Sequence, residues 1–118
     1  MLSTMAVFLA TDRSTAGAYG VTTETGWINN CYWENLLQEG PQRPKAGSYE
    51  LNTGCSTVKV NLKFGLYGSC SSYLYTGWYS DSSAIYVLGA LGSEDCLGLH
   101  QMTSTSPVGT AGNLTYPS

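Results

Sequence analysis

The clearest pattern of hydrophobic and polar positions lies in residues 56–67, which read STVKVNLKFGLY. Four apolar side chains alternate there with polar ones: Val58, Val60, Leu62 and Phe64. Alternation of this kind is typical of a β-strand with one face in the core and the other in water. We therefore predict a strand over 56–67, paired in an antiparallel sheet, as the central element of the fold.

Shorter stretches on both sides predict further strands. Residues 84–91 (AIYVLGAL) are apolar on both faces, which is typical of a central strand buried on both sides. In residues 71–80 (SSYLYTGWYS), Leu74 and Trp78 share one parity and are expected to face the core. The remaining strands are predicted at residues 4–11, 21–28, 49–51 and 96–103.

Residues 30–39 (NCYWENLLQE) are the one stretch that predicts a short helix, which Gly40 and Pro41 would end. A strand running from Gly26 through Trp33 is the alternative for these residues. A loop is expected at 41–47, and the Ser-, Thr-, Gly- and Pro-rich residues 104–118 are expected to form an irregular tail. The 118 residues fit a single domain.

The four cysteines, Cys31, Cys55, Cys70 and Cys96, contain no CxxC pair, and with the lone histidine they match no zinc pattern. We therefore predict two disulfides and neither a metal nor another cofactor. An extended 56–64 segment would span about 30 Å, and the six residues back to Cys70 return only about 20 Å. This disfavours a bond from Cys55 to Cys70. The sequential pairing, Cys31 to Cys55 and Cys70 to Cys96, is favoured over Cys31 to Cys70 with Cys55 to Cys96.

Short strands joined by Gly-rich and Asp/Ser turns predict an all-β protein. The expected architecture is a compact antiparallel β-sandwich or small barrel with about seven strands, two disulfides and at most one short helix. Residues 1–10 (MLSTMAVFLA) lack the basic start of a signal peptide, so 4–11 is predicted to be a strand of the mature chain. No apolar run approaches the ~20 residues of a membrane span.

Charge narrows the possible partners. Only 11% of residues are charged, whereas about 25% is typical of soluble proteins. The net charge is −3 and the five basic residues are scattered, which excludes the basic footprint of a nucleic-acid-binding protein. A surface of Ser, Thr, Asn, Gln, Gly and Tyr is common in secreted proteins and in binders of neutral polar ligands such as sugars.

Candidate catalytic groups are few. The chain has no GxSxG nucleophile motif, and its lone histidine, His100, is expected to be a packed residue rather than a base. Glu94 and Asp95 are adjacent in a predicted turn, which indicates a solvated tip rather than a catalytic carboxylate pair. We therefore predict no catalytic residue, and a small secreted hydrolase remains a second alternative function.

Aromatic residues suggest a binding surface, since the chain has nine tyrosines and three tryptophans. On a strand over 71–80, Tyr73, Tyr75 and Tyr79 would lie on one side at intervals of about 6.5 to 7 Å, with Asp81 close by. Flat rings at this spacing can stack on sugar rings or contact another protein. The sequon Asn113-Leu114-Thr115 makes Asn113 a candidate glycosylation site.

Two resemblances bear on function. The run from Val58 through Trp78 to Ile85 resembles a βγ-crystallin Greek key, in which an aromatic hairpin precedes a Ser-bearing turn and a further strand. In its cysteines, low charge and Tyr/Ser/Gly content, the chain also resembles small secreted fungal proteins of the effector, immune-active (immunomodulatory), lectin or toxin type. This likeness implies an extracellular protein.

Our predicted function is therefore the binding of neutral glycans through the tyrosine face, in the manner of a lectin. The alternative is an effector, immune-active protein or toxin that contacts a host or partner protein or a membrane surface. The residues predict no oligomeric state.

Overall fold

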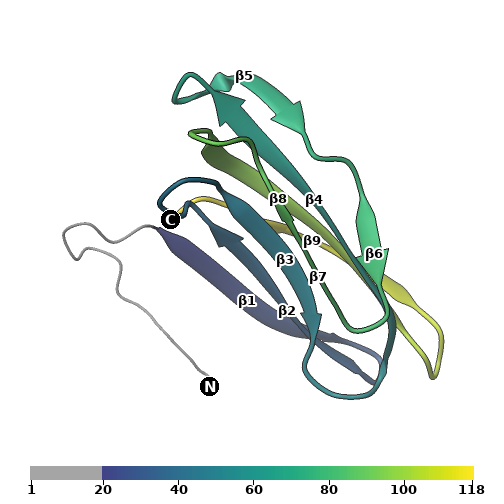
Figure 1. Cartoon of the computed structure of the whole chain (residues 1–118). Helices are drawn as coiled ribbons and strands as arrows, with labels where there is room; N and C mark the ends of the chain where they lie inside the picture. Colours follow the sequence, from purple (N-terminus) through teal and green to yellow (C-terminus); the bar gives the residue numbers. More distant parts are fainter. Residues whose placement is uncertain (1–19) are drawn as a thin grey trace.

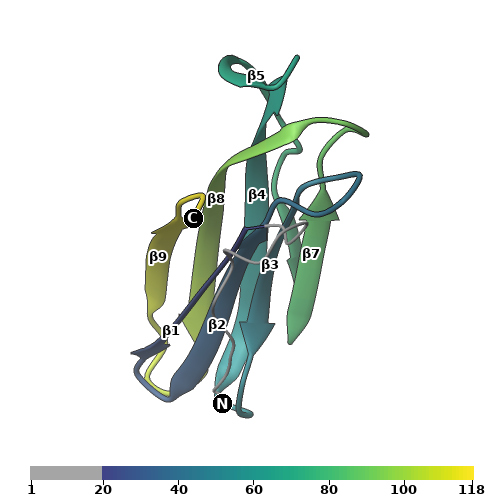
Figure 2. The same cartoon turned by 90° about the vertical axis from the view of Figure 1, so that its left-hand side faces the viewer.

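The computed structural model describes residues 20–118, which form two antiparallel sheets packed as a β-sandwich (Figures 1 and 2). The all-β prediction is confirmed, and two open sheets favour the sandwich over the barrel. The described residues contain nine strands rather than about seven. The strand predicted at 4–11 lies outside the described residues.

Sheet 1 has the strand order β1-β2-β3-β7, with β1 (Val21–Ile28), β2 (Cys31–Gln38), β3 (Lys45–Glu50) and β7 (Ala84–Leu88). Sheet 2 is built around the longest strand, with β4 (Cys55–Leu66), β8 (Glu94–Ser104) and β9 (Thr110–Thr115) in order. Along the other edge of β4 run β5 (Ser69–Tyr75) and then β6 (Tyr79–Asp81), each paired with a different part of it.

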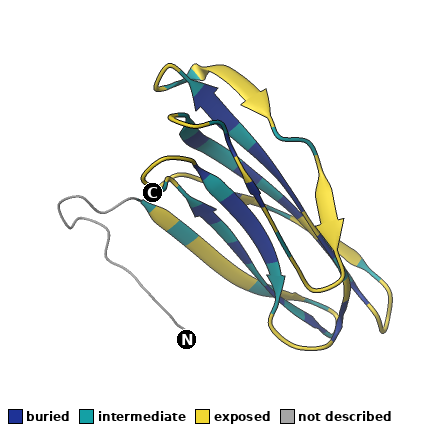
Figure 3. Ribbon diagram, viewed as in Figure 1, coloured by how far each residue is buried: buried dark blue, intermediate teal, exposed yellow. Residues whose placement is uncertain are grey.

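The predicted central strand is confirmed as β4. Its four alternating apolar side chains are buried between the sheets. Three of them pack in a cluster with residues of β2, β3 and β7, whereas Val58 packs in a second cluster around the Cys31–Cys55 disulfide. Figure 3 shows that burial concentrates in β2, β3, β4 and β8, whereas β1, β5 and β6 are largely exposed. The core thus lies between the middle strands of the two sheets.

The helix predicted at 30–39 is wrong, because these residues form β2, a strand whose burial alternates along its whole length. Cys31, Trp33 and Leu37 point inward, and so does the polar Asn35. β2 pairs with β1 through the two-residue turn Asn29–Asn30, in which Asn29 has a φ of 50°. Asparagine tolerates this left-handed conformation, which tight hairpin turns require.

Three further predictions are wrong. The loop predicted at 41–47 is shorter, because its last three residues belong to β3. Residues 84–91 do not form a central strand, because β7 lies at the end of sheet 1 and Tyr86 and Leu88 are exposed. The tail predicted as irregular at 104–118 contains β9, which pairs with β8 over its whole length. The chain end returns to the first strand, since Thr22 Oγ1 donates a hydrogen bond of 2.7 Å to the Tyr116 carbonyl.

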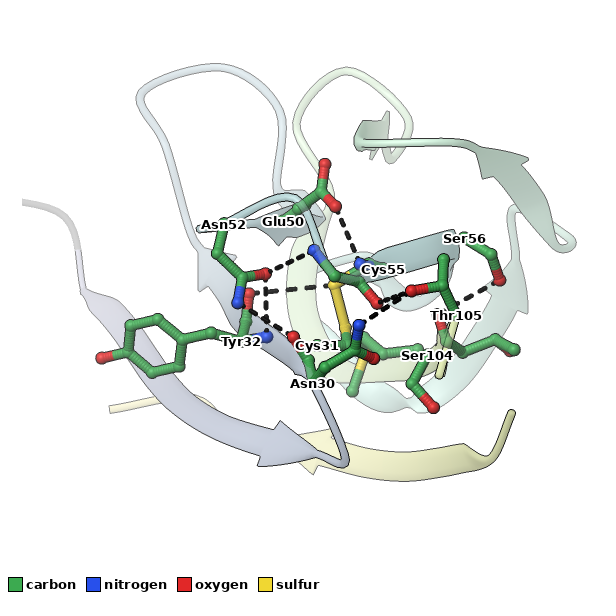
Figure 4. The surroundings of a disulfide bond; sticks show 12 residues. Asn30, Cys31, Tyr32, Glu50, Asn52, Cys55, Ser56, Ser104 and Thr105 are labelled. Carbon is green, nitrogen blue, oxygen red and sulfur yellow. Dashed lines mark hydrogen bonds between the residues drawn. A yellow bond between two sulfur atoms is a disulfide. The ribbon is translucent and has the colours of Figure 1, made fainter. Parts of the chain in front are cut away.

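Both predicted disulfides are present, with the sequential pairing. The bond between Cys31 and Cys55 is buried and joins β2 of sheet 1 to β4 of sheet 2 (Figure 4). The bond between Cys70 and Cys96 joins β5 to β8 across the intervening β4. Gly65 of β4 makes room for it, because a Cβ there would lie 3.0 Å from Cys96 Sγ. No helix among residues 20–118 is long and apolar enough to cross a membrane.

Candidate functional site

The edge of sheet 2 beside β4 carries the predicted tyrosines and contains a bulge. Tyr75 pairs with Lys63, whereas Tyr79 pairs with Val60. The two tyrosines are four positions apart in the sequence, whereas their partners on β4 are three positions apart. One extra residue is therefore inserted between β5 and β6. Since side chains alternate between the faces of a strand, one extra residue reverses the face of everything beyond it.

The bulge is held by Asn61 of β4, a buried residue on the face of sheet 2 that points away from sheet 1. Its Oδ1 accepts hydrogen bonds from Gly77 N at 3.0 Å and from Thr76 Oγ1 at 3.3 Å. Gly77 has a φ of 90°, a conformation that glycine adopts without strain. The Asn61 side chain and Gly77 therefore position Trp78 at the surface.

The predicted tyrosine stripe is only partly correct. Tyr73 and Tyr75 share the outer face of sheet 2 with Lys63, and their rings pack edge to face with centroids 5.8 Å apart. Tyr79 has the inner core residue Val60 as its partner, so it lies on the opposite face. Leu74 and Trp78, which were expected in the core, are instead 53% and 47% exposed.

Trp78 belongs to a shallow hollow of about 550 Å³ on the outer face of sheet 2. The neighbouring strands supply Leu99 and Leu114, which are cross-strand partners and therefore lie on one face. Gln101 and Tyr116 also line the hollow and bring polar atoms to it. Tyr73 and Tyr75 lie on the same face of sheet 2, and we call these two tyrosines and the residues of the hollow together the outer face.

Asp81 does not take part in the outer face. Its Oδ2 accepts hydrogen bonds from the backbone N–H groups of Ser83 at 3.2 Å and Ala84 at 3.4 Å. These bonds close the turn between β6 and β7, which is a common role for aspartate. The carboxylate predicted to assist ligand binding thus shapes a turn.

His100 lies between the sheets and is only 2% exposed, which agrees with the prediction of a packed residue. Its Nδ1 is 2.8 Å from Ser48 Oγ and its Nε2 is 2.8 Å from Thr115 Oγ1. Ser48 Oγ also donates to the Lys59 carbonyl at 2.7 Å. A hydroxyl has one proton, so His100 must carry its proton on Nδ1 and accept at Nε2 from Thr115.

This Ser48–His100 pair is not a catalytic nucleophile and base. Both residues are buried, and the Ser48 hydroxyl proton points to a backbone carbonyl rather than to His100. Nucleophilic catalysis needs the opposite arrangement, in which the histidine accepts the serine proton next to a substrate. No group of histidine, cysteine and carboxylate residues within 20–118 could hold a metal ion.

The geometry at Asn113 argues against the predicted glycan. Asn113 Nδ2 donates hydrogen bonds to Asn35 Oδ1 and to Glu24 Oε1, both at 2.9 Å. A glycan replaces one hydrogen of this amide, and Thr115 of the same sequon is buried against His100. Both hydrogens are therefore already used in the folded chain.

We expect folded protein from a glycosylating host to carry unmodified Asn113. Intact-mass spectrometry should give the mass of the bare polypeptide, and digestion with a peptide N-glycosidase should leave it unchanged. A glycan on Asn113 in protein of normal thermal stability would contradict this prediction.

Comparison of the chain with protein-family models, with curated proteins and with solved structures finds no match in any of the three.

Proposed function

We propose that this chain is a secreted, non-catalytic binding protein that recognises neutral glycans through the outer face. The observation that carries the proposal is that three half-exposed aromatic side chains, Tyr73, Tyr75 and Trp78, lie on the same face of sheet 2. Aromatic rings offer a flat apolar surface and, in tyrosine and tryptophan, a polar end as well. Sugar rings match both properties. Two disulfides support an extracellular location, since such bonds persist in oxidising compartments.

The surroundings of the rings suit a neutral ligand. Lys63 Nζ lies 4.1 Å from the centroid of the Tyr73 ring, so this cation already has an aromatic partner. Gln101 and the hydroxyl of Tyr116 can exchange hydrogen bonds with sugar hydroxyls in the hollow. Binding would therefore rest on ring stacking and neutral hydrogen bonds, and we expect its affinity to change little with salt.

Replacing Trp78 by alanine should weaken glycan binding at least about tenfold, because a central aromatic contact typically contributes ~2 kcal/mol or more. Its side chain is half exposed, so the free energy of unfolding should change by less than about 1 kcal/mol. The native protein would first be screened on a glycan array, and the best neutral ligand would then be titrated by calorimetry.

Trp27→Ala is the matched control. Trp27 is 62% exposed on sheet 1, where its ring stacks on Tyr32 with centroids 4.5 Å apart. This variant removes an equally large ring from the other sheet and should bind the glycan as the native chain does. An array without any saturable ligand would contradict the proposal and favour a protein partner.

A further inference from the structure

A second groove lies along one open edge of the sandwich, where β7 of sheet 1 faces β6 of sheet 2 (Figure 1). Its volume is about 590 Å³. Three tyrosines from both sheets and one arginine line it: Tyr75, Tyr79, Tyr86 and Arg43. We call it the edge groove. Tyr79 lies there because the bulge turns it away from the outer face.

Apolar side chains and bare backbone form the base of this groove. Phe64 and Val87 contribute from the core, and Gly89 lies against them. A Cβ at Gly89 would come within 3.0 Å of the Phe64 ring and 2.7 Å of Pro44 Cγ. Residue 89 must therefore be a glycine for the backbone to pack this closely against Phe64 and Pro44. The base of the groove is consequently apolar, and the tyrosine rings line its sides.

Arg43 is held at the groove by its backbone surroundings. Its Nε donates a hydrogen bond of 2.6 Å to the Gly89 carbonyl. The same two loops are joined by bonds from Gly89 N to the Pro44 carbonyl at 2.8 Å and from Gly92 N to the Gln42 carbonyl at 2.7 Å. Within residues 20–118, no carboxylate pairs with the Arg43 guanidinium, whose terminal N–H groups can therefore receive a ligand.

We propose that the edge groove binds a sugar ring that carries a carboxylate, such as a uronic acid residue. The Arg43 guanidinium would hold the carboxylate through its paired N–H groups, a geometry that suits carboxylates well. Tyr79 and Tyr86 would contact the faces of the ring above the apolar floor. The groove shares Tyr75 with the outer face, whereas Arg43, Tyr79 and Tyr86 line the groove alone.

The positive charges around the edge groove suit a ligand with one carboxylate better than a polysulfated chain. The other cation nearby, Lys45, has its Nζ 4.7 Å from the centroid of the Tyr86 ring. Lys59 lies on the outer face of sheet 2, with Gln101 and Ser80 as its cross-strand partners. A polyanion needs several clustered cations, which a chain of net charge −3 does not provide here. One guanidinium matches one negative charge.

Methyl β-D-glucuronide and methyl β-D-glucoside form a suitable pair of probes, because they differ only in a carboxylate in place of a hydroxymethyl group. Both would be titrated into the full protein and followed by the amide NMR signals of the edge groove. The glucuronide should bind about tenfold more tightly, as expected for a partly exposed charge-assisted pair. Arg43→Gln should reduce its affinity to that of the glucoside, whereas Lys59→Gln should leave it unchanged.

Two more variants separate the possible explanations. Tyr79→Ala leaves the Arg43–Gly89 hydrogen bond in place and should weaken both sugars. Trp78 lines the hollow of the outer face but not the edge groove, so Trp78→Ala should leave glucuronide binding intact even if the outer face binds nothing. Equal affinity of the native protein for the two sugars, an undiminished affinity in Arg43→Gln, or no movement of the groove signals at saturating sugar would overturn the inference.

Discussion

Replacing Cys31 and Cys55 together by alanine should lower the free energy of unfolding by about 4 to 5 kcal/mol. The two residues are 24 positions apart, and closing a loop of this length restricts the unfolded chain by about 3.5 kcal/mol. A further ~1 kcal/mol comes from packing, since the sulfurs lie in a buried cluster with Trp33, Val58 and Met102. Many domains have only about 5 to 15 kcal/mol in total, so this variant should be barely folded.

The second disulfide provides a matched control. Cys70 and Cys96 are 26 positions apart, so the loop entropy is nearly the same, and the two loops do not overlap. Both cysteines are half-buried at the edge of the molecule, and their bond stays within sheet 2. Urea unfolding of Cys70→Ala with Cys96→Ala should therefore show a loss of only about 3.5 kcal/mol. If this pair costs as much as the buried one, the packing contribution is wrong.

β4 could be predicted because apolar and polar residues alternate from Val58 to Phe64 and every inward position of this segment is apolar and buried. β2 has the same alternation in the structure, yet one of its inward positions is Asn35. This polar residue interrupts the alternation of apolar and polar positions. It is tolerated in the core because it forms hydrogen bonds with Asn113 and Ser48 on other strands. These partners are 13 and 78 residues away along the chain, so the local pattern does not show them and predicts a helix instead.

The faces of the aromatic residues show a second limit. The faces predicted for 71–80 require an uninterrupted strand. The structure has one extra residue there, in a bulge that the hydrogen bonds from Thr76 and Gly77 to Asn61 hold in place. Gly77 was the one local signal, since an isolated glycine within a strand pattern often marks a bulge. This glycine could therefore indicate that Trp78 and Tyr79 each point to the face opposite to the predicted one. It could not indicate which groove each side chain lines.

The disulfide pairing, by contrast, could be narrowed by chain geometry from three possibilities to two. An extended β4 separates Cys55 from Cys70, so neither can reach the other, and each pairs instead with a cysteine on a neighbouring element. The reach of the chain leaves open both Cys31–Cys55 with Cys70–Cys96 and Cys31–Cys70 with Cys55–Cys96, and the structure contains the first. The choice between them depends on which strands face each other across the sandwich.

Acidification should destabilise the protein through His100. Burial lowers the pKa of His100 to about 4, although a hydrogen bond with the Gly47 backbone partly opposes the shift. An unfolded histidine has a pKa near 6.5, so the unfolded chain binds a proton first. The stability due to neutral His100 is complete above pH ~6.5 and is lost as the pH falls toward 4. The whole shift corresponds to about 3 kcal/mol.

Among residues 20–118, no carboxylate bonds directly to His100, so a charged imidazolium would lie between the sheets without an acidic partner from this part of the chain. Glu24 is connected to His100 through a chain of hydrogen bonds that passes through Asn113, Asn35 and Ser48. Glu34 acts in the opposite sense, since burial raises the pKa of its carboxyl and its protonation in acid favours the folded state. The net loss of stability in acid is therefore the loss from His100 minus the gain from Glu34.

A comparison of the native chain with His100→Gln isolates the histidine. Glutamine can keep one hydrogen bond but does not titrate, so this variant should be less stable at pH 7 and should lose less stability between pH 6.5 and 4. Free energies of unfolding from urea titrations at a series of pH values would give both slopes, and carboxyl groups such as Glu34 contribute equally to each. Parallel slopes would show that His100 does not control the acid stability. A native curve steeper by a total of about 3 kcal/mol would confirm that the intersheet network depends on its neutral form.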